Sequence, residues 1–223
     1  MANMNIPANL KLVKKGEIDS AIKKDITRRV KKSYQLVETK LGRIVQDMVD
    51  RQLMASSTMQ SIMNGKLRSD FGLTTTMASE AVKQIMDHIV SNIKVSFTAT
   101  SRSAAVLSLE LLPMGIDQLT AIPAGSYMST GKLGGGEVSW LTWLLTRGTQ
   151  VVLGDFYVFE NPKGRSRTGE SIMQRVGKTG QEGFRVDPGF SGTEEDNFVI
   201  RALEPVLDKI RDVVFSTVAE GLK

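Results

Sequence analysis

The fold class is decided by residues 82–111, which read VKQIMDHIVSNIKVSFTATSRSAAVLSLEL. At the start of this stretch the apolar residues recur every three or four positions, which predicts an amphipathic helix. The residues on that stripe are Val82, Ile85, Met86, Ile89 and Ile93. The apolar period then becomes two over residues 93–99 and again over 105–111, which predicts an antiparallel hairpin with its turn at 100–103. A helix that leads into such a hairpin favours an α+β fold.

Further helices are predicted on both sides of this region. From Ile18 to Met54 the apolar residues return in steps of mostly three or four, which indicates one amphipathic helix of roughly 35 residues. A short second helix is expected over residues 58–67. The apolar line of residues 203–218 predicts a terminal helix, for which Thr193 is the expected cap.

Two glycine-rich segments, 113–136 and 161–192, are predicted to be long loops. Loops of this length inside a domain usually have a function or become ordered on assembly. Between them, residues 137–146 predict a short apolar helix and residues 151–159 a strand. Trp140 and Trp143 would share one face of that helix, as core residues or as anchors of an interface.

The inventory of reactive side chains excludes most enzyme classes. The 223 residues include no cysteine and one histidine, His88, which excludes disulfides, thiolate chemistry and any two-histidine metal site within one chain. His88 is expected near the polar edge of its helix, as a surface residue rather than a general base. We therefore expect no catalytic residue, cofactor or metal. We see no secretory signal at the start of the sequence and no apolar run that would span a membrane, so we expect the protein to stay in the cytoplasm.

Basic charge is concentrated at the start of the chain. The formal net charge is +5, but residues 1–54 hold 12 basic and 6 acidic residues, and the remainder holds 17 basic and 18 acidic. Lys24, Arg28 and Lys32 are four residues apart and share one helical face. Such a face attracts a polyanion or an acidic protein, or it serves only to keep the helix solvated. The expected organisation is a basic helical region, 1–73, followed by an α+β body, 74–223.

The second glycine-rich segment is also basic. The candidates for contact with an acidic surface or a phosphate backbone are Arg165, Arg167, Arg175 and Arg185. Phe184 is the only aromatic ring near them, so stacking on single-stranded nucleic acid is not expected. The alternative interpretation is a flexible loop that its charges keep soluble.

Two stretches carry a resemblance to a known family. Residues 164–173 read GRSRTGESIM, and residues 184–203 read FRVDPGFSGTEEDNFVIRAL. Together with the order of the elements, they resemble the neck and tail-completion structural proteins of tailed bacteriophages. The resemblance is best over residues 137–203 and only general before them.

The resemblance implies a non-enzymatic virion protein, made in the host cytoplasm, that forms a homo-oligomeric ring at the head–tail junction. Other neck, connector or tail proteins would be its neighbours, and its basic segments would face translocating DNA or an acidic protein surface. A different class of function stays open at this point. Residues 14–32 and 163–185 would also suit a nucleic-acid-binding protein that does not read sequence.

Overall fold

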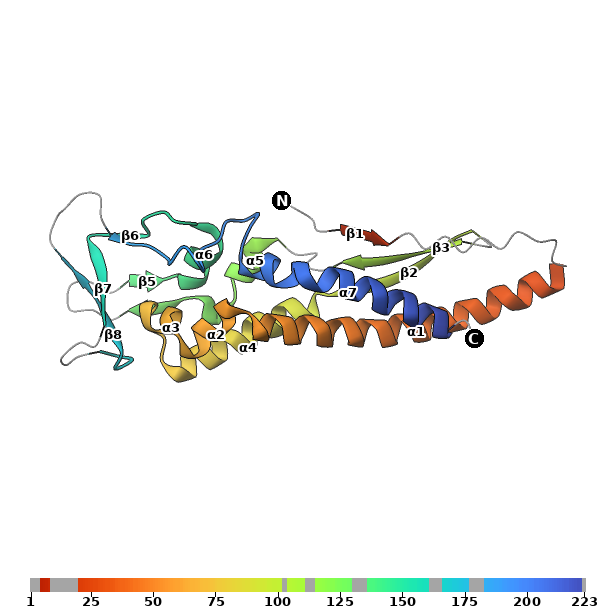
Figure 1. Cartoon of the computed structure of the whole chain (residues 1–223), viewed down its shortest axis with the longest axis horizontal. Coiled ribbons are helices and arrows are strands. Elements are labelled where there is room, and N and C mark those ends of the chain that lie inside the picture. The colour runs from red at the N-terminus through yellow and green to blue at the C-terminus, as the bar shows by residue number, and fades with distance from the viewer. Residues whose placement is uncertain are drawn as a thin grey trace. The chain divides into compact units, whose positions relative to one another are not determined.

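The computed structural model describes residues 5–8, 20–101, 104–110, 115–129, 136–160, 166–176 and 183–221 (Figure 1). The chain divides into two compact units. Unit 1 is formed by residues 52–88 and 115–204, and unit 2 by residues 2–51, 89–114 and 205–223. Each unit therefore combines segments that are distant in sequence, whereas the division expected from the sequence was a single boundary after residue 73.

The helices of unit 2 come from three parts of the chain. Helix α1 (Ser20–Ala55) has 36 residues, as its apolar period predicted, and contributes the part up to residue 51. Its buried residues Val37, Leu41, Val45 and Val49 are four apart and share one face. Unit 2 also includes the end of α4 (Thr75–Ser91) and most of α7 (Phe198–Gly221).

Side-chain contacts join these helices. The Lys40 ammonium lies 3.1 Å from the Glu220 carboxylate and so connects α1 with α7. The Gln46 side-chain amide donates to the Val90 carbonyl at 3.4 Å and connects α1 with the end of α4.

A three-stranded antiparallel sheet completes unit 2. Strands β2 (Lys94–Ser101) and β3 (Ala104–Glu110) form the predicted hairpin, with Val95 opposite Leu109. Strand β1 (Asn5–Ala8) pairs with the other side of β3, giving the order β1–β3–β2. The sequence did not predict β1, because four residues that include Pro7 show no period. An edge strand is where a sheet tolerates proline.

The core of unit 1 is formed by short helices. They are α2 (Ser57–Asn64), α3 (Lys66–Asp70), α5 (Ile116–Thr120), the 3₁₀ turn η1 (Pro123–Gly125) and α6 (Trp140–Thr146), together with the parts of α4 and α7 in this unit. The Phe71 ring lies at their centre, 5.5 Å from the Trp140 ring and 6.2 Å from that of Phe184.

The second helix expected from the sequence is in fact two helices, which meet at Gly65. A Cβ atom on Gly65 would lie 2.8 Å from the Ser61 Cα, closer than real Cβ atoms approach. The chain changes direction there, and the Ser61 hydroxyl accepts the Leu67 N–H at 3.0 Å.

The described residues of unit 1 also form three two-stranded antiparallel sheets. Strand β4 (Tyr127–Ser129) pairs with β5 (Gly136–Val138), β6 (Leu153–Gly154) with β9 (Gly183–Phe184), and β7 (Phe156–Glu160) with β8 (Ser171–Arg175). The predicted loops 113–136 and 161–192 are thus wrong where the chain is described, since they contain α5, η1, β4, β8 and β9. Each of these elements is at most five residues long, too short to produce a periodic pattern.

The strand predicted over residues 151–159 is divided in two. Asp155 lies between β6 and β7 with a φ of 62°, the one described non-glycine residue with a positive φ. At this left-handed residue the chain leaves β6, which pairs with β9, and enters β7, which pairs with β8.

The start of α7 also differs from the prediction. The Asn197 side-chain oxygen accepts the N–H groups of Val199 and Ile200 at 3.1 and 3.3 Å, so Asn197 caps the helix. The Thr193 hydroxyl instead accepts the Asp196 N–H at 3.1 Å in the turn before it. Pro205 lies inside α7, which continues to Gly221. The α+β class itself is confirmed, since the described chain combines helices with small antiparallel sheets.

Candidate functional site

The described part of the GRSRTGES stretch, residues 166–171, forms a tight turn that leads into β8. The Ser166 hydroxyl accepts the Gly169 N–H at 2.9 Å and donates to the Ser171 carbonyl at 2.5 Å. The Thr168 hydroxyl accepts the N–H groups of Glu170 and Ser171 at 3.2 and 3.4 Å. Gly169 has a φ of 78°, which favours glycine. Short hydroxyl side chains and one glycine therefore give this turn its shape.

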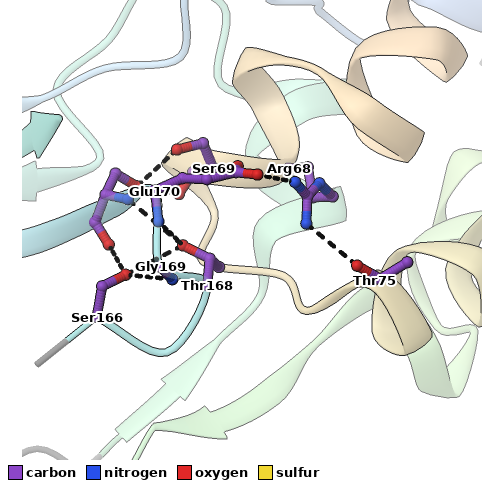
Figure 2. A network of polar contacts seen from close by, with 8 residues as sticks. Arg68, Ser69, Thr75, Ser166, Thr168, Gly169 and Glu170 are labelled. Atoms are coloured by element: carbon purple, nitrogen blue, oxygen red, sulfur yellow. Dashed lines mark hydrogen bonds and ion pairs between the residues drawn. The ribbon is translucent and has the colours of Figure 1, made fainter. Parts of the chain in front are cut away.

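Polar contacts hold this turn against α3 (Figure 2). The Ser69 hydroxyl donates to the Ser171 hydroxyl at 2.8 Å, and the Ser171 hydroxyl donates to the Ser69 carbonyl at 2.7 Å. The Arg68 guanidinium forms an ion pair with Glu170 and lies 3.4 Å from the Thr75 hydroxyl. We call this set of residues the α3–β8 clasp: Arg68, Ser69, Ser166, Thr168, Glu170 and Ser171.

Arg167 binds the residues that follow α3. Its guanidinium donates to the Gly72 carbonyl, from Nε at 3.0 Å and also from Nη2. The same group lies 4.2 Å from the centre of the Tyr127 ring, whose hydroxyl donates to the Phe71 carbonyl at 2.7 Å. Arg167 therefore has partners within unit 1, and its predicted contact with an acidic surface or with phosphate stays a prediction.

The other basic candidates are not brought together with Arg167. Arg175 lies on β8, 3.5 Å from the Asp155 carboxylate, and its side chain is half exposed. Arg185 follows β9 and is exposed. Arg165 lies outside the described residues. Lys24, Arg28 and Lys32 lie on α1, where only the course of the helix is described.

The two tryptophans of α6 differ in their surroundings. Trp140 is completely buried, and its indole N–H donates to the Ala124 carbonyl at 3.0 Å. Trp143 is half-buried, with its ring 6.3 Å from the Phe184 ring. Trp140 is therefore a core residue of unit 1 rather than a surface anchor.

A buried carboxylate, Asp70, ends α3. Burial raises its pKa above the usual value of 3.8, and this effect is opposed by the hydrogen bond and charge of Lys66. The negative charges of Glu160 and Asp187 raise the pKa of Asp70 further. These acidic groups do not make a metal site: among the residues whose placement is described, no three or more acidic or histidine side chains are arranged to hold an ion.

The sequence did not identify Arg68, Ser69 or Tyr127, which contact the described part of the GRSRTGES stretch. Arg68 and Ser69 lie about a hundred residues before their partners in this stretch, and Tyr127 contacts Arg167. Nothing local marks them, because a contact of this kind requires two distant segments to meet. The short turn residues themselves were the available signal in the sequence.

His88, on α4, is half-buried. No described helix is both long and apolar enough to cross a membrane.

Comparison with known proteins identifies no relative. The chain matches no protein-family model, no curated protein and no solved structure.

Proposed function

We propose that this chain is a non-enzymatic virion structural protein that forms a homo-oligomeric ring at the head–tail junction of a tailed phage, as a neck, tail-completion or terminator subunit. Other neck, connector or tail proteins would be its neighbours. The protein would be made in the host cytoplasm and remain in the virion.

One observation supports this proposal: the described residues of the stretches that resemble the phage proteins make hydrogen bonds and ion pairs within unit 1. In the first stretch they form the α3–β8 clasp and the Arg167 contact. In the second, the Asp187 carboxylate accepts the Gly189 N–H at 2.9 Å, and Asn197 caps α7. Arg201 donates to the Ser191 carbonyl and pairs with Asp196. Motif residues with structural contacts are what a subunit without a reaction centre requires.

The charge arrangement bears on the alternative, a nucleic-acid-binding protein that does not read sequence. Of the basic residues expected to contact phosphate, Arg167 is bound to a backbone carbonyl and a ring, and Arg175 faces a carboxylate. A guanidinium that already has partners gains less from a phosphate, because it must give them up. For Arg167 and Arg175 this favours the structural proposal, and it leaves the basic residues of segment 14–32 as the candidates for facing DNA.

The proposal is tested by disrupting this gene in its source genome and examining the particles by electron microscopy, with a plasmid copy of the gene as the control. We expect filled heads beside unattached tails, and complete particles once the plasmid is supplied. Normal particles without the gene would contradict the proposal. Affinity of the purified protein for DNA that falls about 10³-fold or more between 50 and 200 mM salt would then support the alternative.

A further inference from the structure

The corner between α2 and α3 contains a chemically labile dipeptide, Asn64-Gly65, the one asparagine–glycine pair in the sequence. Asparagine is among the residues that degrade on heating. It loses its side-chain amide when the backbone nitrogen of the next residue attacks its side-chain carbonyl carbon. A glycine in that next position favours the attack, because it has no Cβ atom to crowd the approach and its backbone is free to rotate.

The other asparagines are less suited to this reaction. Each of them is followed by a residue with a larger side chain or by proline: Asn3, Asn5, Asn9, Asn92, Asn161 and Asn197. Proline has no N–H, so its nitrogen has no proton to lose before an attack. Asn197 is 2% exposed and its side chain caps α7. Asn64, in contrast, is exposed to solvent.

The end of α2 holds the attacking nitrogen away from its target. The Gly65 N–H donates to the Ser61 carbonyl at 3.0 Å, as the backbone bond that closes this helix. A bond of this kind directs the N–H back along the helix axis. The nitrogen can reach the Asn64 side chain only after it has turned away from Ser61 and lost its proton. The hydrogen bond must therefore break before the reaction begins.

The end of α2 is less firmly packed than the rest of the helix. The four buried residues of α2 are Thr58, Met59, Ser61 and Ile62, whereas Asn64 at its end is exposed. A helix of eight residues has little stability apart from its packing. Poorly packed ends of elements open locally at a small cost in free energy. Opening of this last turn releases the Gly65 N–H without unfolding of unit 1.

We propose that Asn64 is the site at which this chain deamidates spontaneously, and that opening of the last turn of α2 sets the rate. A hydroxide ion or buffer base removes the Gly65 amide proton. The nitrogen then bonds to the Asn64 Cγ, the bond from Cγ to Nδ2 breaks, and ammonia leaves with a proton from water. Water opens the cyclic imide at either carbonyl, which gives aspartate or isoaspartate. This inference does not depend on the proposed ring.

The isoaspartate product should disturb the start of α3. It lengthens the backbone by one carbon at a corner where a Cβ atom on Gly65 would lie 2.8 Å from the Ser61 Cα. The Ser61 hydroxyl also accepts the Leu67 N–H at 3.0 Å, across the same corner. The new carboxylate lies at the C-terminal end of α2, where the helix dipole disfavours negative charge. Because α3 carries Arg68 and Ser69, deamidation should loosen the α3–β8 clasp.

Peptide mass spectrometry of the full-length protein, incubated at mildly alkaline pH, tests the site. Labelling by an isoaspartyl methyltransferase identifies the isoaspartate product. We expect position 64 to become acidic before any other asparagine, and Asn64→Gln to abolish the isoaspartate label there. The reaction in urea-unfolded protein should be faster by about 2–12-fold or more, the factor that corresponds to one hydrogen bond. Earlier deamidation at another asparagine, or none at position 64, would overturn the site.

A second variant tests the role of α2. Ser56→Ala removes the hydroxyl that caps this helix and accepts the Met59 N–H at 3.3 Å. It should raise the rate at Asn64 about 2–30-fold, the factor that corresponds to a lost N-cap. The matched control is Ser216→Ala, at an exposed serine of α7, which should leave the rate unchanged. Far-ultraviolet circular dichroism checks that both variants are folded. Equal rates in Ser56→Ala and the wild type, or in folded and unfolded protein, would overturn the role of α2.

Discussion

At the scale of single residues, several of the described charged side chains join segments of unit 1. Arg167 shows this most clearly, because its guanidinium is held both by the Gly72 carbonyl and by the Tyr127 ring. Gly72 has a φ of 63°, and a Cβ atom there would lie 3.0 Å from the Arg167 side chain. The left-handed glycine and the arginine therefore fit each other, and the sequence identified only the arginine.

Asp70 should make the stability of unit 1 depend on pH. Burial raises its folded pKa above 3.8, so its protonated form suits the folded state. Its contribution is most favourable below about pH 3.8 and is lost as the pH rises through the folded pKa. We expect the unfolding free energy of the wild type, relative to that of Asp70→Asn, to fall across this range in urea titrations at a series of pH values.

The matched control for this measurement is Asp117→Asn, which removes an exposed carboxylate from α5. Because this variant keeps Asp70, its unfolding free energy should still fall as the pH rises through the folded pKa of Asp70. A difference between wild type and Asp70→Asn that is the same at every pH would contradict the raised pKa.

At the scale of elements, replacing either of two glycines by alanine should change the stability of the protein in opposite directions. Gly42 lies inside α1, and a Cβ atom added there would have no neighbour within 4 Å, so Gly42→Ala should stabilise the protein by about 0.5–1 kcal/mol. Gly65 joins α2 to α3, where a Cβ would meet the Ser61 Cα at 2.8 Å. Gly65→Ala should destabilise it by about 1–3 kcal/mol. Urea unfolding of both variants measures this, and equal signs would contradict the tight turn at Gly65.

Removing one partner of the ion pair in the α3–β8 clasp should cost more stability than removing the other. The Arg68 side chain is 12% exposed and that of Glu170 is 46% exposed. Glu170→Gln leaves a largely buried guanidinium without its counter-ion and should cost about 1–3 kcal/mol. Arg68→Met leaves a carboxylate that water can reach and should cost less. The double variant should resemble Arg68→Met alone.

Urea unfolding of these three variants measures the losses of stability, and hydrogen exchange at β8 shows whether this strand is released from α3. Lys40→Met is the control, because it breaks an ion pair whose side chains are 58% and 65% exposed, and its effect should stay below about 1 kcal/mol. A larger loss of unfolding free energy in Arg68→Met than in Glu170→Gln would contradict the idea that the burial of Arg68 sets these costs.

At the scale of the whole molecule, basic charge is concentrated in residues 1–54, which hold 12 basic and 6 acidic residues. Replacing Lys24, Arg28 and Lys32 by Glu should leave the circular dichroism spectrum unchanged and lower the yield of infectious particles, because it reverses the charge of one helical face. The control is the triple variant Lys83→Glu, Lys94→Glu, Lys209→Glu, which makes the same change in net charge at exposed positions. Equal infectivity of the two variants would contradict a role for this face.

The sequence by itself determined the long elements of this protein. The length of α1, the extent of α4 and the β2–β3 hairpin follow from apolar periods, since a period records which side of a helix or strand is buried. The α+β class follows from the same periods. The candidate residues Arg167 and Trp140 were also identified from the sequence, but their surroundings were not.

Only the tertiary structure decided the short elements and the contacts of the site. Strands β8 and β9 lie in a segment that predicts a loop, and β8 is held in place by Ser69 and Arg68, about a hundred residues earlier in the chain. The separation of β6 from β7 at Asp155, which has a positive φ, was likewise visible only in the structure. Such elements are stabilised by contacts with segments that are distant in sequence rather than by their own apolar period. These contacts form only when the chain folds, so the local sequence does not predict them.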